Sequence, residues 1–171
     1  MQTYLDEGLT VLHGRGTTLA CICRGTDYNN TLVGISRQPT PEMVIEKAHE
    51  FIKLYNIDSV YCATEDAAIY AKFEKEFGAR LIPNIQRKYN GNDGMLLAQY
   101  NVKHNIDATT VAREYFRSIY IVSQCDYFIG GAVSSTGAVM LMPNNFKETY
   151  VFRLGSMTAD DVAHGRAASL T

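Results

Sequence analysis

Short apolar runs recur along the chain, and most are followed by a polar break and then by apolar residues at helical spacing. The clearest run, LACIC at residues 19–23, contains no polar position, which is typical of a strand buried on both faces of a parallel sheet. Four further runs have the length and composition of strands. The five predicted strands cover residues 19–23, 59–64, 80–82, 127–129 and 149–154.

Helical patterns separate these runs. Thr40 and Pro41 favour a helix start, and the apolar residues that follow recur at close to helical spacing as far as Tyr55. An apolar stripe predicts the clearest helix over residues 107–124, with Asp107, Thr109 or Thr110 as its capping residue. The other predicted helices cover residues 2–12, 67–77 and 134–142, whereas residues 83–105 are predicted to form a long loop with one helical turn.

The alternation of strand and helix predicts the fold class. It indicates an α/β protein with a Rossmann-like three-layer α/β/α arrangement and a mostly parallel sheet. A length of 171 residues is enough for one domain with its own core. We therefore expect a single Rossmann-like domain over residues 1–171, in which residues 1–16 form a leading helix and turn and residues 155–171 form a loosely ordered tail.

Composition and charge exclude several classes of partner. Hydrophobic residues make up 46% and charged residues 20%, as in an ordinary soluble protein. The formal net charge of −2 offers no broad basic field, so we expect no nucleic acid and no anionic membrane as a partner. No apolar run approaches the ~20 residues of a membrane span, and the acidic first residues do not resemble a signal peptide. Cys21, Cys23, Cys62 and Cys125 lack zinc or disulfide spacing, so we expect buried free thiols in a reducing cytoplasm.

Polar side chains follow the first two predicted strands. Arg24 and Asp27 follow the first, and Glu65 and Asp66 follow the second. The carboxyl ends of parallel strands open into the crevice where α/β proteins bind ligands. The guanidinium of Arg24 can hold two phosphate oxygens at once, while the carboxylates can accept hydrogen bonds from ribose hydroxyls or a guanine edge. In the simpler alternative, Arg24 and Asp27 form a surface ion pair and Asp66 only caps the next helix.

A serine-rich turn follows the fourth predicted strand. Ser134, Ser135 and Thr136 begin the next helix, and a helix amino terminus with small hydroxyl residues is a natural anion site. Arg24 opposite this terminus could bracket a diphosphate. Asp126, just before the strand, is a further candidate for ligand contact. The simpler alternatives are that Ser134 caps its helix and that Asp126 is a surface residue.

These motifs, in this order, resemble the carboxyl-terminal, donor-binding half of the GDP-fucose fucosyltransferases of the α-1,6, α-1,2 and protein-O types. The family's histidine falls on Ile22 and its second arginine on Gly25, which are two departures. In relatives the histidine position can address guanine through its backbone, so Ile22 remains a candidate. The matching segments are residues 22–27 (HxRRxD-like), 63–66 (ATDD-like), 123–126 (SQxD) and 134–135 (SS).

The resemblance implies a GT-B-like architecture of two Rossmann-like domains, of which this chain has the length for one. An amino-terminal acceptor domain would then be a missing partner, and the glycan or peptide acceptor is left open. The implied activity is an inverting transfer of fucose from GDP-fucose, the donor substrate, with no metal and no other cofactor. In this reaction an acceptor hydroxyl attacks the anomeric carbon while GDP departs.

The resemblance also implies roles for particular residues. Arg24 would be the main diphosphate ligand and would stabilise the charge that builds on the leaving group. Ser135 would contact the β-phosphate, and Asp126 would contact guanine. The glutamate that serves as base in the α-1,6 relatives has no counterpart in residues 29–38, which contain no carboxylate. Asp27 is the remaining candidate for a catalytic carboxylate.

Two other functions fit the same pattern. A non-catalytic nucleotide-sugar-binding module would bind GDP without turnover. Another Rossmann-like nucleotide-binding enzyme would use a dinucleotide, but the chain has no GxGxxG after its first strand. The Gly14–Gly16 pair precedes that strand, where it predicts a turn. Binding of GDP, GDP-fucose, UDP and NAD, compared side by side, separates these functions.

Overall fold

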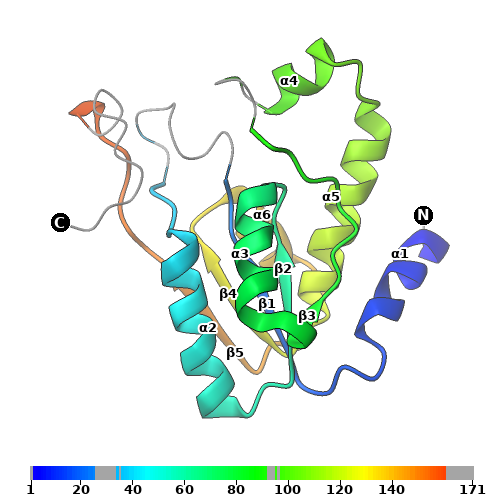
Figure 1. Cartoon of the computed structure of the whole chain (residues 1–171), viewed down its shortest axis with the longest axis vertical. Coiled ribbons are helices and arrows are strands. Elements are labelled where there is room, and N and C mark those ends of the chain that lie inside the picture. Colours follow the sequence, from blue (N-terminus) through cyan, green and yellow to red (C-terminus); the bar gives the residue numbers. More distant parts are fainter. Residues whose placement is uncertain (1, 26–33, 35, 92–94, 96, 161–171) are drawn as a thin grey trace.

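Among the described residues, five parallel strands form one sheet at the centre of the protein (Figure 1). The computed structural model describes residues 2–25, 34, 36–91, 95 and 97–160. The strand order is β3-β2-β1-β4-β5, the order of a Rossmann-like sheet, and the predicted fold class is confirmed. The strands are β1 (Thr18–Ile22), β2 (Ser59–Ala63), β3 (Leu81–Ile82), β4 (Tyr127–Gly131) and β5 (Glu148–Phe152).

Helices cover both faces of this sheet and complete three layers (Figure 1). Helices α2 and α3 pack on one face, α5 and α6 pack on the other, and α1 lies against α5. Helix α4 stands away from the sheet, near the beginning of α5. None of the helices in the described ranges is both long and apolar enough to cross a membrane. The helices are α1 (Gln2–Leu9), α2 (Pro41–Tyr55), α3 (Ala67–Phe77), α4 (Leu97–Lys103), α5 (Ala108–Ser123) and α6 (Ser134–Leu141), with the short 3₁₀ helices η1 (Thr10–Leu12) and η2 (Gly78–Arg80).

Capping residues determine where three of these helices begin. The hydroxyl of Thr40 accepts a hydrogen bond from Met43 N at 3.3 Å, and Pro41 occupies the first position of α2. Asp66 and Asp107 cap α3 and α5, and each carboxylate accepts hydrogen bonds from two first-turn amides. The capping role that the sequence allowed for Asp66 is therefore confirmed.

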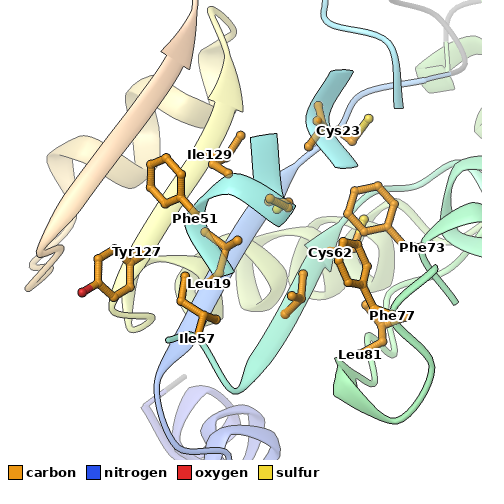
Figure 2. Close-up of a cluster of buried hydrophobic side chains, with 14 of the residues drawn as sticks. Leu19, Cys23, Phe51, Ile57, Cys62, Phe73, Phe77, Leu81, Tyr127 and Ile129 are labelled. Carbon is orange, nitrogen blue, oxygen red and sulfur yellow. The ribbon is translucent and has the colours of Figure 1, made fainter. Parts of the chain in front are cut away.

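The central strands are buried because helices cover both of their faces. Every residue of β1, β2 and β4 is buried. Successive residues face opposite layers: Leu19, Cys21 and Cys23 point toward α2 and α3, whereas Ala20 and Ile22 point toward α5 and α6. Figure 2 shows the first of these two clusters, between the sheet and helices α2 and α3.

All four cysteines are buried free thiols, as predicted. Cys21 and Cys62 are register partners on β1 and β2, and Cys23 lies one step beyond the end of β1 on the same face. Burial raises the pKa of Cys21 and Cys62 well above the ordinary value, and it raises the pKa of Cys125 to about 12. These thiols therefore pack as small apolar side chains and carry no charge at neutral pH.

The structure also corrects several element boundaries. The predicted 83–105 loop contains α4, a seven-residue helix. Strand β3 has only two residues, because Arg80 belongs to the 3₁₀ turn that follows α3. Strand β5 begins at Glu148 and ends at Phe152, because its parallel pairing with β4 runs only from Tyr127 to Gly131.

The segment that follows β5 contacts the loop before α2. Gly34 N donates to Met157 O at 2.9 Å, and Arg37 N donates to Gly155 O at 2.8 Å. The start of the tail that was predicted to be loose is thus held by backbone hydrogen bonds. Residues 161–171 of that tail lie outside the described residues.

Candidate functional site

The carboxyl ends of β1, β2 and β4 meet at one edge of the sheet, where a pocket of about 250 Å³ opens. In the order β3-β2-β1-β4-β5 the chain reverses direction across the sheet between β1 and β4. A reversal of this kind leaves a crevice beyond the strand ends, which is the usual ligand site of open α/β sheets. Charged and polar lining residues of this pocket include Arg24, Glu65, Arg87, Asn101, Glu114 and Ser134.

Arg24 and Glu65 form a nearly buried ion pair at the centre of this edge. Arg24 lies two residues beyond β1, and its Nη1 is 3.3 Å from Glu65 Oε2. The side chains are 14% and 2% exposed, so the pair is largely removed from water. The other carboxylate oxygen of Glu65 accepts a hydrogen bond from Gly25 N at 3.3 Å. Glu65 therefore fixes both the guanidinium of Arg24 and the backbone that follows it.

A glycine is required at position 25, because the backbone there lies close to the side chain of Asp66. A Cβ atom at residue 25 would lie 2.4 Å from Asp66 Oδ2, which is far inside van der Waals contact. Asp66 cannot move away freely, because its Oδ1 accepts hydrogen bonds from the amides of Ala68 and Ile69 and caps α3. This position, where the resembling family has a second arginine, therefore has no room for any side chain here.

The first turn of α6 faces the same edge. Ser134 lines the pocket with Arg24, and the buried Ser135 lines a second, small cavity of about 10 Å³ that shares Arg24 and Glu65 with the pocket. The capping position is Val133, which has no side-chain cap, so Ser134 is the first helical residue and not the cap. Thr136 Oγ1 donates to Gly131 O at 2.7 Å and ties the helix start to the end of β4. First-turn amides of a helix have no intrahelical acceptor, which makes this end suited to an anion.

The segment after β3 supplies pocket residues that the sequence analysis did not single out. Tyr89 forms a parallel bridge with Asp66, in which Tyr89 N donates to Glu65 O at 2.8 Å and Ala67 N donates to Tyr89 O at 3.0 Å. The buried hydroxyl of Tyr89 donates to Asn101 Oδ1 of α4 at 2.9 Å. The bridge places residues 86–89 along the pocket. The hydrogen bond from Tyr89 to Asn101 attaches α4 to this segment.

Helix α5 forms the other wall and holds the same segment. Arg87 N donates to Glu114 Oε2 at 3.0 Å, and Tyr115 adds an aromatic surface. Lys88 turns away from the pocket: its Nζ donates to the carbonyls of Asn84 and Gln86, at 3.1 and 2.5 Å. Burial lowers the pKa of Lys88. The sequence signal for this wall is the presence of Arg87 and Lys88 within residues 83–105, because the bridge between Tyr89 and Asp66 joins residues that are distant in sequence.

Asp126, the residue expected to contact guanine, is not brought to the pocket. It precedes β4, so it lies at the amino-terminal edge of the sheet, whereas the pocket lies beyond the carboxyl ends. Five residues of strand separate the two edges by about 17 Å. Asp126 Oδ2 accepts hydrogen bonds from Thr18 N at 2.9 Å and Thr18 Oγ1 at 3.1 Å, and Oδ1 lies 2.8 Å from Lys147 Nζ. Burial raises the pKa of Asp126, but the hydrogen bonds from Lys147 and Thr18 outweigh burial, so the pKa lies below its usual value.

Ile22 and Asp27 are the remaining predicted site residues. Ile22 is the last residue of β1, pairs with Ala63 and Gly130 in the sheet, and lines the small cavity beside Ser135. Its side chain is buried. Asp27, the candidate for a catalytic carboxylate, lies outside the described residues.

The fold and this edge define a Rossmann-like α/β protein with a polar pocket at the reversal point of its sheet. No protein-family model matches the chain, and no curated protein matches it. Within the described residues, no group of three or more His, Cys, Asp or Glu side chains could hold a metal ion. The function is therefore inferred from the chemistry of the pocket.

Proposed function

We propose that this protein binds a nucleoside diphosphate sugar, GDP-fucose, at the carboxyl edge of its sheet, as the donor-binding half of an inverting, metal-independent fucosyltransferase-like enzyme. The observation that carries the proposal is that Arg24 and the first turn of α6 open on one pocket. A diphosphate is held best by a charge-assisted donor together with free backbone amides. Arg24, Ser134 and Ser135 supply both kinds of donor within the same crevice.

The size and lining of the pocket suit one part of such a ligand. A volume of about 250 Å³ is just below the ~300–1,000 Å³ that encloses a complete small ligand. It accommodates a diphosphate with one ring. Glu114 of α5 and Asn101 of α4 offer oxygens that accept hydrogen bonds from ring hydroxyls, and Tyr89 and Tyr115 offer flat apolar surface. The rest of the nucleotide would extend along the strand ends.

In the proposed reaction an acceptor hydroxyl attacks the anomeric carbon of the sugar, and the bond from that carbon to the diphosphate oxygen breaks. Negative charge then grows on the leaving diphosphate. Arg24 and the amino terminus of α6 would stabilise it, which is an electrostatic contribution that needs no metal. Asp27 remains the candidate to accept the proton of the hydroxyl. The preference for guanine rests on the sequence resemblance alone, because Asp126 lies at the other edge.

Calorimetric titration of the purified chain tests this proposal. GDP and GDP-fucose are expected to bind, and UDP, ADP and NAD to bind more weakly. Arg24→Ala is expected to abolish most GDP binding, and Arg24→Lys to restore only part of it, because lysine keeps the charge but loses the two-pronged contact. Arg80→Ala removes an equal charge from the exposed 3₁₀ turn and serves as the matched control. Equal affinity for GDP and ADP would refute the guanine assignment, and GDP binding unchanged in Arg24→Ala would refute the site.

A non-catalytic nucleotide-sugar-binding module is the second candidate, and one observation favours it. Both described carboxylates of the pocket already have partners: Glu65 is paired with Arg24, and Glu114 accepts a hydrogen bond from Arg87 N. A carboxylate that is engaged in this way is a poor proton acceptor. Release of GDP from GDP-fucose, with and without Asp27→Asn, separates the candidates. A rate above the uncatalysed hydrolysis that falls in Asp27→Asn supports the enzyme, and no release despite GDP binding supports the module.

A further inference from the structure

We propose that Arg87 is the second guanidinium that holds the diphosphate, in the same pocket as Arg24. The inference rests on the proposed function above and names a further ligand-binding residue for it. Arg24, Arg87 and Ser134 line the same pocket, although they come from three separate segments of the chain. The two arginines and the α6 terminus would then all contact the diphosphate within one pocket.

The strand that carries Arg24 cannot provide a second cation itself. Gly25 would place a Cβ atom 2.4 Å from the carboxylate of Asp66, so no side chain fits beside Arg24. Arg24 is also neutralised by Glu65 at 3.3 Å, and the pair together carries no net charge. A diphosphate, which carries at least two negative charges, therefore needs a further positive group in the pocket.

Arg87 has the placement and the availability for this role. Its backbone is fixed by the hydrogen bond from its N to Glu114 Oε2 at 3.0 Å, and the parallel bridge at Tyr89 holds the chain two residues later. Its side chain is exposed, and its guanidinium makes no hydrogen bond or ion pair with any residue in the described ranges. The guanidinium can therefore turn to a ligand without breaking an existing contact.

The neighbouring cation does not compete for this assignment. Lys88 Nζ donates to the carbonyls of Asn84 and Gln86 and lies 4.6 Å from the ring centre of Tyr70. Lys88 thus supports the loop and is not among the residues that line the pocket, whereas Arg87 is. Because Glu114 holds the backbone of Arg87 and not its side chain, replacing the side chain leaves the loop anchored. A substitution of Arg87 therefore tests the side chain without disturbing the backbone hydrogen bond to Glu114.

The test is calorimetric titration of the full chain, wild type and Arg87→Ala, with GDP, GMP, guanosine and inorganic pyrophosphate. We expect Arg87→Ala to weaken GDP and pyrophosphate binding roughly tenfold, as for loss of one charge-assisted hydrogen bond, with a smaller effect on GMP and none on guanosine. Arg87→Lys should recover part of the loss. Arg80→Ala is the matched control, and melting temperatures should be the same for all four proteins.

Each result decides between distinct conclusions. If Arg24→Ala loses GDP while Arg87→Ala binds it as the wild type does, the proposed function stands and the role of Arg87 is overturned. If the wild type binds pyrophosphate but no nucleotide, and Arg87→Ala loses pyrophosphate, the second arginine is supported and the nucleotide assignment fails. If the wild type binds neither, both proposals fail. Equal losses for GDP, GMP and guanosine in Arg87→Ala would show a nucleoside contact and overturn the diphosphate role.

Discussion

Replacing Glu65 with glutamine gives the sharpest test of how the pocket is built. The change keeps the size of the side chain and an oxygen that can accept the hydrogen bond from Gly25 N, but it removes the charge that faces Arg24 at 3.3 Å. Glu65 is 1% exposed, so water has little access to this position and cannot solvate the Arg24 guanidinium in place of the lost charge. The variant leaves the largely buried guanidinium of Arg24 without the carboxylate charge of Glu65 beside it.

The cost to stability follows from that burial. Removing one partner of a buried ion pair typically costs ~3–5 kcal/mol, and we expect Glu65→Gln to lie near the lower value because it preserves the hydrogen bond to Gly25. For a domain of this size each kcal/mol lowers the melting temperature by roughly 2–4 °C, so the expected decrease is about 6–12 °C. The variant should therefore still fold at room temperature.

The effect on ligand binding has the opposite sign. In the wild type the charge of Glu65 lies beside Arg24 at the same pocket and repels any phosphate that binds there. Two unit charges ~6 Å apart at an effective dielectric constant of about 20 interact by about 3 kcal/mol, which screening by salt reduces. Since a tenfold change in affinity corresponds to about 1.4 kcal/mol, we expect GDP to bind at least tenfold more tightly to Glu65→Gln.

Thermal melting with and without GDP measures both effects in one experiment. The expected pattern is a lower melting temperature without ligand and a larger upward shift with saturating GDP than in the wild type. Glu74→Gln, an exposed position on α3, removes the same charge and should change neither value appreciably. The electrostatic reasoning is refuted if GDP affinity falls together with stability, because Glu65 would then act mainly by orienting Arg24.

Three further predictions concern the surroundings of the pocket. Asp126→Asn should destabilise the fold by about 1–2 kcal/mol at pH 7, because it weakens the hydrogen bonds to Thr18, while GDP affinity stays unchanged. Since the pKa of this carboxyl is lowered in the folded state, the wild-type advantage should be complete above about pH 4 and disappear as the pH falls further, which urea unfolding at several pH values measures. Tyr89→Phe leaves a buried oxygen of α4 without its donor and should speed hydrogen exchange in α4 while costing about 1–3 kcal/mol; unchanged exchange would count against the attachment. Gly25→Ala should cost about 1–3 kcal/mol, whereas Gly137→Ala in α6, where a Cβ meets nothing within 4 Å, should be neutral or stabilising by chemical denaturation.

The fold was predictable from local patterns to a large extent. Continuous apolar runs marked the buried strands β1, β2 and β4, and the capping residues Thr40, Asp66 and Asp107 marked helix starts that the structure has at those positions. The predicted element boundaries are wrong where the pairing of a strand with its neighbour determines its limits. Strand β5 is exposed along most of its length and its limits follow from β4, so its own sequence could not define them.

The site was predictable only where its residues directly follow strands. Arg24, Glu65 and Ser134 meet in one pocket because the carboxyl ends of parallel strands lie together. The wall that contains Arg87 and Tyr89 depends on a parallel bridge between Tyr89 and Asp66. A single bridged residue in a glycine- and asparagine-rich segment has no periodic pattern, so that contact could not be predicted from local sequence.

Strand direction explains both the successes and the failure among the predicted site residues. In a parallel sheet, a polar residue just before a strand lies at the amino-terminal edge, and one just after a strand lies at the carboxyl edge. Asp58 and Asp126 precede β2 and β4, and their carboxylates accept hydrogen bonds from Thr17 N and Thr18 N, at 2.8 and 2.9 Å, where the chain enters β1. Arg24 follows a strand and reaches the pocket. The two aspartates therefore secure the entry to the central strand, and a ligand held by Arg24 has to be recognised by residues that lie after β1, β2, β3 and β4, which is where Arg87 and Ser134 are found.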